Sequence, residues 1–288
     1  MPLPRSRKTH KMKKKFKKVY VEITNVCNLH CPFCHGTKRA PGRMSAEAFR
    51  QVMEKLDGVT EYVYYHLLGE PLLHPELGQM LGIAAEHGMK SCITTNGTLL
   101  AEKEELLLKV PPLYRLSVSL HSFEANGGDG LYAYLEDVWR VCRRLSARGT
   151  YCVLRLWNGG GAESLNGAIW DFLCEKTGTE PEVTARGYKL CDRMYLEKER
   201  KFDWPDENAP ERSVRFCYGL RDQLGILCDG TVVPCCLDAE GVIALGNIFD
   251  SSVEEIVASP RAEALYRGFS DGKPTEELCR RCGYASRF

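Results

Sequence analysis

The sequence predicts an α/β protein with a parallel sheet of strand and helix units, followed by a small cysteine-rich domain. Three observations lead to this prediction. Between residues 18 and 190, short β-rich segments alternate with helical patterns, which is typical of a parallel sheet. The length of 288 residues accommodates one large domain and a small second one. Six of the 14 cysteines lie in the last 72 residues.

Six segments rich in Val, Ile, Tyr and Thr are expected to form the strands. They are residues 19–24, 62–68, 91–95, 114–120, 150–157 and 182–188. Six strands are few for a closed barrel.

The helices between these strands are predicted from hydrophobic residues at i, i+3, i+4 and i+7. Ser45 is a possible N-cap for the first helix, and Asp229 with Gly230 is a possible hairpin turn in the C-terminal part. The charged stretch 192–214 contains two prolines and no such period. We therefore expect a basic arm over 1–18, a barrel over 19–191, a connector over 192–214 and a second domain over 215–288.

The charges are distributed unevenly, although the net charge is only +1. Residues 1–18 contain nine Lys or Arg and no acidic residue, leaving 30 basic against 38 acidic residues elsewhere. We interpret this arm as solvated and disordered, with nucleic-acid binding as the weaker alternative. No segment has the apolar length of a signal peptide or a membrane span, which predicts a cytoplasmic protein with no membrane partner.

Three cysteines, Cys27, Cys31 and Cys34, lie within eight positions directly after the first predicted strand. Polar clusters follow the later strands, and all should meet at the carboxyl edge of the sheet. Three thiolates leave one iron of a 4Fe–4S cluster open for a small molecule. A structural zinc site, with His30 or His35 as fourth ligand, is the alternative.

The segment CNLHCPFC, residues 27–34, resembles the signature of the radical S-adenosylmethionine (SAM) enzymes. This resemblance implies that the fold is a partial (β/α)6 barrel. It also implies that the amino and carboxylate groups of SAM bind the open iron. One electron then cleaves the sulfonium bond, and the resulting 5′-deoxyadenosyl radical abstracts a hydrogen atom from the substrate. An electron donor such as flavodoxin or ferredoxin is also implied.

The resemblance also implies residues that bind SAM, at positions matching the family's pattern. Phe33 would lie near the adenine, and Gly69 with Glu70 would hold the methionine ammonium, although Leu68 replaces the family's first glycine there. Ser117 and Ser119 match hydroxyl partners of the ribose. Arg155 matches a cation for the SAM carboxylate, and Thr95 with Asn96 would line the same pocket. Any of these could instead be a strand-end or turn residue.

The C-terminal cysteines follow a second pattern, in which Cys217, Gly230 and Cys235 have the spacing Cys-x12-Gly-x4-Cys. This spacing resembles the SPASM and Twitch extensions of radical SAM enzymes, which carry auxiliary iron–sulfur clusters. Cys217, Cys235, Cys279 and Cys282 would hold one auxiliary 4Fe–4S cluster in a small domain of hairpin and helices. Zinc is again the alternative, and the roles of Cys228 and Cys236 stay open.

An auxiliary cluster implies a two-electron oxidation of the substrate. The family favours a peptide or protein substrate, with a crosslink or an oxidised side chain as product. A small polar metabolite such as an aminosugar alcohol is the alternative, and RNA modification is weaker. A different class of function, a non-catalytic zinc protein that binds nucleic acid through its arm, also stays open. The sequence does not single out a general base.

Overall fold

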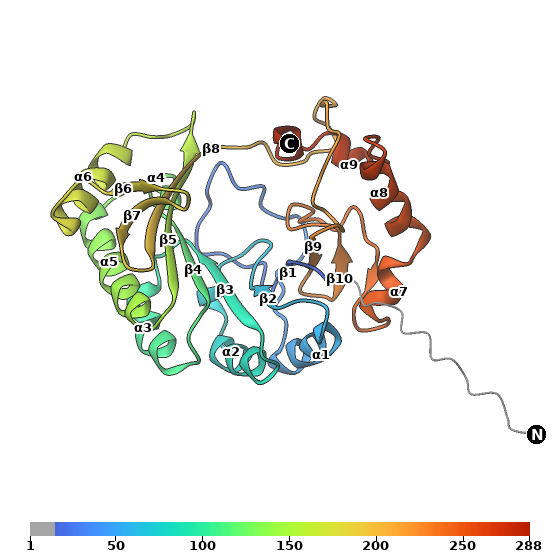
Figure 1. The fold of residues 1–288 in the computed structure, drawn as a ribbon, viewed down its shortest axis with the longest axis horizontal. Helices are drawn as coiled ribbons and strands as arrows, with labels where there is room; N and C mark the ends of the chain where they lie inside the picture. The colour runs from blue at the N-terminus through green and yellow to red at the C-terminus, as the bar shows by residue number, and fades with distance from the viewer. Residues whose placement is uncertain (1–14) are drawn as a thin grey trace, which may run out of the picture.

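The computed structural model describes residues 15–288, and the first 14 residues of the predicted basic arm lie outside this range. One mixed sheet of 11 strands curves into an open barrel, with most helices of residues 46–177 on its outer side and the C-terminal elements beside its first strand (Figure 1). Residues 16–18 belong to the fold rather than to an arm, because Phe16 is buried in the core and Lys18 begins β1.

The strands are β1 (Lys18–Val21), β2 (Tyr62–Tyr64), β3 (Lys90–Thr95), β4 (Arg115–Ser119), β5 (Tyr151–Gly159), β6 (Glu182–Thr184), β7 (Gly187–Cys191), β8 (Met194–Arg200), β9 (Gln223–Ile226), β10 (Thr231–Val233) and β11 (Gly246–Asn247). The helices are α1 (Ala46–Leu56), α2 (Leu77–Glu86), α3 (Leu100–Lys109), α4 (His121–Glu124), α5 (Leu131–Ala147), α6 (Asn166–Thr177), α7 (Val253–Val257), α8 (Pro260–Ser270) and α9 (Glu277–Arg280), with 3-10 turns η1 (Pro71–Leu73) and η2 (Ala285–Arg287).

The strand order is β11-β10-β9-β1-β2-β3-β4-β5-β8-β7-β6, and the pairs from β1 through β5 to β8 are all parallel. The partial (β/α)6 barrel is therefore confirmed, but its sixth strand is β8. The expected strand at 182–188 is instead part of the antiparallel hairpin of β6 and β7, and β8 lies inside the expected connector. This expectation failed because β8 buries only Met194 and Leu196 and is otherwise polar.

The C-terminal hairpin extends the barrel sheet, since β9 pairs parallel with β1 and antiparallel with β10. Gly230 forms the predicted turn with a φ of +86°. The predicted helix cap Ser45 before α1 is also confirmed, and Ser252 forms a capping box before α7.

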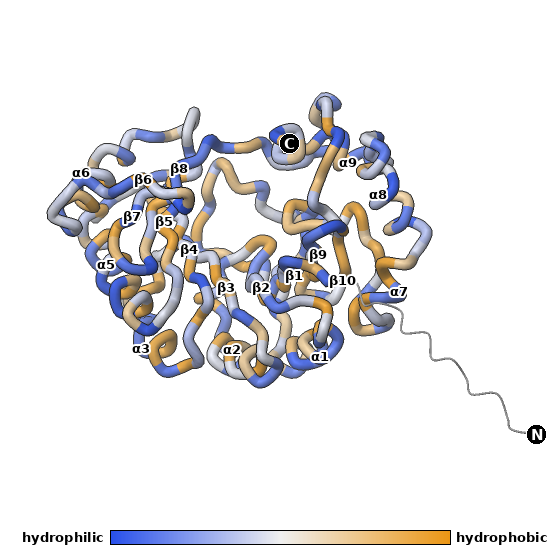
Figure 2. Tube along the Cα trace, in the orientation of Figure 1, coloured by the Kyte–Doolittle hydropathy of each residue, from blue (hydrophilic) through white to orange (hydrophobic). Residues whose placement is uncertain are grey.

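Helices and strands bury one shared apolar layer between them. Val19 and Val21 of β1 pack in this layer with Phe49 and Met53 of α1, whereas Tyr20 points to the opposite, inner face of the sheet. Helices α3 and α5 alternate hydrophobic and hydrophilic residues, as expected for helices with one buried face (Figure 2). Among residues 15–288, no helix combines the length and hydrophobicity that crossing a membrane requires.

Candidate iron–sulfur and SAM site

The three clustered cysteines lie on the loop of residues 25–42, which we call the cysteine loop. It begins just after β1, and hydrogen bonds of Asn25 join the two ends of the loop. The side chain of Asn25 donates to the carbonyl oxygen of Ala40 at 2.9 Å and accepts the backbone N–H of Gly42 at 2.7 Å. The loop thus presents its cysteines at the carboxyl edge of the sheet, as the sequence predicts.

Local hydrogen bonds shape the loop around its thiols. The backbone N–H of Leu29 donates to the sulfur of Cys27 at 3.4 Å, and the N–H of Cys34 donates to the carbonyl oxygen of Cys31 at 3.0 Å. Cys27 and Cys34 are exposed, and Cys31 is half-buried. The three cysteines therefore lie near the surface of the protein rather than in its core.

Phe33 projects from this loop toward α4, where its ring centroid lies 4.9 Å from that of His121. Its carbonyl oxygen accepts a hydrogen bond from the indole N–H of Trp204 at 3.0 Å. Trp204 belongs to the connector, and its ring stacks on His35. The connector therefore contacts the cysteine loop, and Phe33 is 39% exposed. Its adenine contact stays a prediction.

Gly69 and Glu70 follow β2 and pack directly against the base of the cysteine loop. Gly69 has a φ of +77°, and a Cβ at this position would lie 2.2 Å from the carbonyl oxygen of Thr24, so only glycine fits. The N–H of Glu70 donates to the carbonyl oxygen of Val26 at 2.8 Å. These contacts bring Gly69 and Glu70 beside the cysteine loop, and their role toward the methionine ammonium stays a prediction.

The Glu70 carboxylate is buried and bound by backbone donors. It accepts the N–H groups of Leu72 at 3.0 Å and Asn96 at 2.8 Å. Burial raises its pKa, and these two N–H groups counteract part of that effect. Each carboxylate oxygen can accept a further hydrogen bond, so an ammonium group remains a chemically suitable partner.

Thr95 and Asn96 close β3 in contact with both Glu70 and the cysteine loop. The hydroxyl of Thr95 accepts the N–H of Gly97 at 3.0 Å, which shapes the turn. The amide nitrogen of Asn96 donates to the side-chain oxygen of Asn28 at 2.9 Å and lies 3.9 Å from the sulfur of Cys27. Both residues therefore lie at the predicted site.

Ser117, Ser119 and Arg155 come from β4 and β5, where Ser119 pairs with Arg155 in register. Ser117 accepts a hydrogen bond from Arg115, which also forms an ion pair with Glu197 at 2.8 Å. The O–H of Ser117 remains a donor for a further contact. These three residues lie on adjacent strands, and their roles toward SAM stay predictions.

The inner face of the barrel carries buried polar atoms that lack a hydrogen-bond partner among residues 15–288. They include Nδ1 of His66, Nε of Arg155 and Nε1 of Trp157. The guanidinium of Arg155 stacks on Trp157 at 3.7 Å, and burial lowers its pKa to about 10, so it stays protonated at neutral pH. Unpaired buried polar atoms are costly, so these groups are suited to a polar ligand.

The four cysteines of the predicted auxiliary site line one small cavity of the C-terminal domain. These residues are Cys217, Cys235, Cys279 and Cys282, and the same cavity is also lined by Asp238, Phe269 and Tyr284. Burial raises the pKa of each of the four thiols. A cation or cluster that binds thiolates would offset the cost of deprotonating them.

The lining of this cavity supplies four thiols, which is the number of ligands that either a 4Fe–4S cluster or a structural zinc ion takes. Each thiolate of a cluster binds a different iron, so the ligands surround a volume, whereas zinc ligands meet at one point. Both alternatives therefore stay open on the lining of the cavity alone.

The neighbouring Cys236 faces the opposite way from Cys235. It packs in the inner-face cluster of Tyr20, Leu67 and Val233, and the hydroxyl of Tyr20 is its hydrogen-bonding partner. Burial raises the pKa of the Cys236 thiol to about 11. The two adjacent cysteines thus lie on the boundary between the auxiliary cavity and the barrel interior.

The structure adds residues that the sequence patterns did not single out, namely Glu22, Arg39, His66 and Asn126. A buried ion pair between Glu22 and Arg39 joins β1 to the cysteine loop at 2.8 Å. These residues carry no motif, and only the fold brings them to the site.

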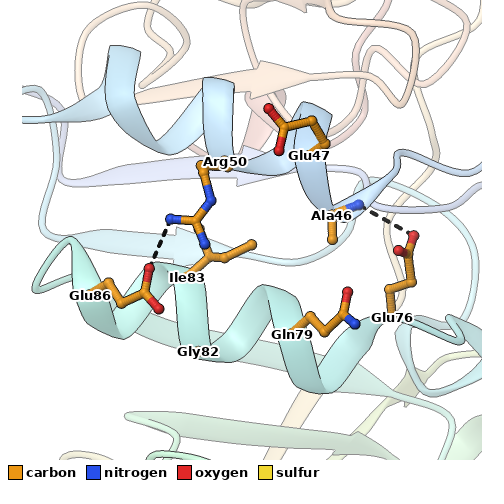
Figure 3. A pocket seen from close by; sticks show the side chains of 8 residues that line it. All are labelled: Ala46, Glu47, Arg50, Glu76, Gln79, Gly82, Ile83 and Glu86. Carbon is orange, nitrogen blue, oxygen red and sulfur yellow. Dashed lines mark hydrogen bonds and ion pairs between the residues drawn. The ribbon is translucent and has the colours of Figure 1, made fainter.

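A separate hollow between α1 and α2, where Arg50 pairs with Glu86, lies outside the barrel and holds none of the predicted site residues (Figure 3).

Two family models match this chain. The model of the radical SAM superfamily matches residues 21–162, and the SPASM model, described as an iron–sulfur cluster-binding domain, matches residues 217–283. The first match contains the cysteine loop and the inner-face residues of β2 to β5. The second contains all four auxiliary cysteines.

Curated relatives align over most of the chain. An S-adenosyl-L-methionine-dependent 2-deoxy-scyllo-inosamine dehydrogenase from Niallia circulans is 28% identical over 285 residues, which are 96% of both chains. An AdoMet-dependent heme synthase from Oleidesulfovibrio alaskensis is 21% identical and covers 91% of this chain and 79% of its own.

Solved structures share the fold at low sequence identity. BtrN in complex with AdoMet and 2-DOIA superposes with a TM-score of 0.61, 17% identity and 94% coverage of both chains. SuiB from Streptococcus suis bound to the precursor peptide SuiA has a TM-score of 0.60 and 17% identity, covering 95% of this chain and 71% of SuiB.

Proposed function

Because the chain belongs to the radical SAM superfamily and carries a SPASM domain, we propose that this enzyme removes two electrons from a small polar substrate bound inside its barrel. In this family the SAM-bound cluster supplies a 5′-deoxyadenosyl radical, and an auxiliary cluster offers an acceptor for one electron. The residues of this chain would bind both groups, orient the substrate and exclude water from it.

The observation that carries this proposal is the placement of Cys235 and Cys236. Cys235 lines the auxiliary cavity, while Cys236 contacts Tyr20 on the inner face of the barrel. A substrate in the barrel would therefore be separated from the auxiliary site by the segment that carries these two cysteines. This proximity suits a reaction in which the substrate loses an electron after losing a hydrogen atom.

A small substrate is supported by two facts. The unpartnered polar atoms of His66, Arg155 and Trp157 on the inner face suit hydroxyl or amino groups. The alignment with the inosamine dehydrogenase also runs over 96% of both chains. A peptide substrate is the second candidate, because the SuiB structure of the same fold holds a precursor peptide.

The test is anaerobic purification followed by incubation with SAM, dithionite and 2-deoxy-scyllo-inosamine. We expect a brown protein with about eight irons, as two cubane clusters require, and 5′-deoxyadenosine formed together with a ketone product. The variant with Cys27, Cys31 and Cys34 all replaced by Ala should retain about four irons and form no 5′-deoxyadenosine. A colourless protein containing stoichiometric zinc would contradict the proposal. 5′-Deoxyadenosine without the ketone would direct the search to peptides.

A further inference from the structure

Asn126, in the turn after α4, makes a contact with the cysteine loop that no sequence motif indicates. Its side-chain nitrogen donates to the sulfur of Cys31 at 3.2 Å and to the carbonyl oxygen of Ser122 at 2.8 Å. Its side-chain oxygen accepts the backbone N–H of His30 at 2.9 Å. One amide therefore binds both a predicted cluster ligand and the residue before it.

The orientation of this amide follows from its backbone partners. A backbone N–H can only donate, so the group facing His30 is the amide oxygen. A backbone carbonyl can only accept, so the group facing Ser122 is the amide nitrogen. The nitrogen therefore directs an N–H toward Cys31, although the side chain of Asn126 is exposed.

The turn that carries Asn126 is built to hold it there. Its own backbone N–H donates to the carbonyl oxygen of Phe123 at 3.1 Å, which continues the end of α4. Gly127 and Gly128 follow with φ values of +107° and +71°, so the chain reverses immediately after the asparagine. The position of the amide is thus set by the backbone on both sides.

We propose that Asn126 raises the reduction potential of the SAM-binding cluster by donating a hydrogen bond to the sulfur of Cys31. Reduction adds negative charge to a cluster and its thiolates, and an N–H donor stabilises the more negative state. Hydrogen bonds to sulfur are among the factors that set the potentials of iron–sulfur clusters. Asn96 is the weaker counterpart, since its nitrogen lies 3.9 Å from the sulfur of Cys27. This inference rests on the proposed SAM-binding cluster but does not depend on the identity of the substrate.

Two substitutions separate hydrogen-bond donation from support of the loop. Asn126→Asp removes the N–H donor but keeps an oxygen for the N–H of His30, whereas Asn126→Ala removes both without adding charge. The matched control is Asn247→Asp in the C-terminal domain. Asn247 likewise donates to a backbone carbonyl, that of Asp229, and accepts a backbone N–H, that of Phe249.

The measurement is an anaerobic redox titration of the holoprotein followed by electron paramagnetic resonance, with the auxiliary cluster as internal reference. Both Asn126 variants should lower the equilibrium constant for reduction of the SAM-binding cluster by up to about tenfold. For one electron this equals a reduction potential that is lower by about 59 mV. The auxiliary cluster and the Asn247 variant should keep their potentials. This readout needs no substrate and no turnover.

Three results would overturn the proposal. Unchanged potentials in both Asn126 variants would mean that the N–H has no influence on the cluster. A change in Asn126→Ala alone would assign the effect to the lost contact with His30. Loss of the SAM-binding cluster from both variants, with the auxiliary cluster retained, would make Asn126 a structural residue of the loop.

Discussion

The ion pair between Glu22 and Arg39 offers a sharp test of how the two cysteine sites are held together. Glu22 follows β1 and its carboxylate is fully buried, while Arg39 belongs to the cysteine loop. The guanidinium of Arg39 also donates to the carbonyl oxygen of Ala239 at 2.8 Å and lies 3.9 Å from the sulfur of Cys228. One side chain thus connects the barrel, the cysteine loop and the C-terminal domain.

Replacing Arg39 by Met leaves the Glu22 carboxylate buried without a cation. Removing one partner of a buried pair costs about 3–5 kcal/mol of unfolding free energy. The matched control is Lys109→Met, because Lys109 pairs with Glu105 at 3.3 Å and both side chains are largely exposed. An exposed pair contributes about 0.2–1 kcal/mol.

The assay is urea unfolding of the anaerobic holoprotein, followed by tryptophan fluorescence. The double variant Glu22→Gln with Arg39→Met should lose less stability than Arg39→Met alone, since it no longer buries an unpaired charge. The reasoning is refuted if Arg39→Met and Lys109→Met lose equal stability. It is equally refuted if the double variant is less stable than Arg39→Met.

Three further predictions follow from single positions. Gly69→Ala should lower the unfolding free energy by about 1–3 kcal/mol, because its Cβ would meet a backbone carbonyl oxygen. The control is Gly82→Ala in α2, whose Cβ would have nothing within 4 Å and which should be tolerated. Thermal unfolding compares the two variants. Cys235→Ala should reduce the iron content to about four per chain, while Cys236→Ala should keep about eight, as measured by iron analysis. Burial, reinforced by a nearby guanidinium, lowers the pKa of His66 to about 3, so its unfolded form binds more protons and stability falls as pH drops from about 6.5 toward 3. A His66→Phe variant should lose less thermal stability between pH 7 and pH 5.

Features encoded by neighbouring residues were the ones that could be predicted. The spacing of Cys27, Cys31 and Cys34 is a local property, and so is the hairpin turn at Gly230, which the structure confirms. The helices were recognisable because each buries one stripe of apolar residues. The sixth barrel strand was missed because β8 ends in the charged residues Lys198 to Arg200. In a parallel sheet such a strand is identified by its pairing with β5 rather than by its own pattern.

The polar residues around the cysteine loop could not be predicted for a different reason. Asn126 lies 95 positions from Cys31, and Glu22 is separated from Arg39 by the loop itself. An asparagine before two glycines has the composition of an ordinary turn, so its sequence context indicates no ligand contact. Its contact with sulfur arises only because β4 and β1 end at the same edge of the sheet.

The cysteine spacing therefore determines which cluster can bind, whereas residues distant in the sequence adjust the potential and stability of that cluster. The cysteine spacing determines how many thiolates are offered, and that number is local. The side-chain hydrogen-bond donors that those thiolates meet come from the turn after α4 and from the end of β3, which are joined only by the fold. Chains with the same cysteine motif can therefore hold clusters of different potential and stability. The substitutions at Asn126 and Arg39 would alter these properties without removing a single ligand.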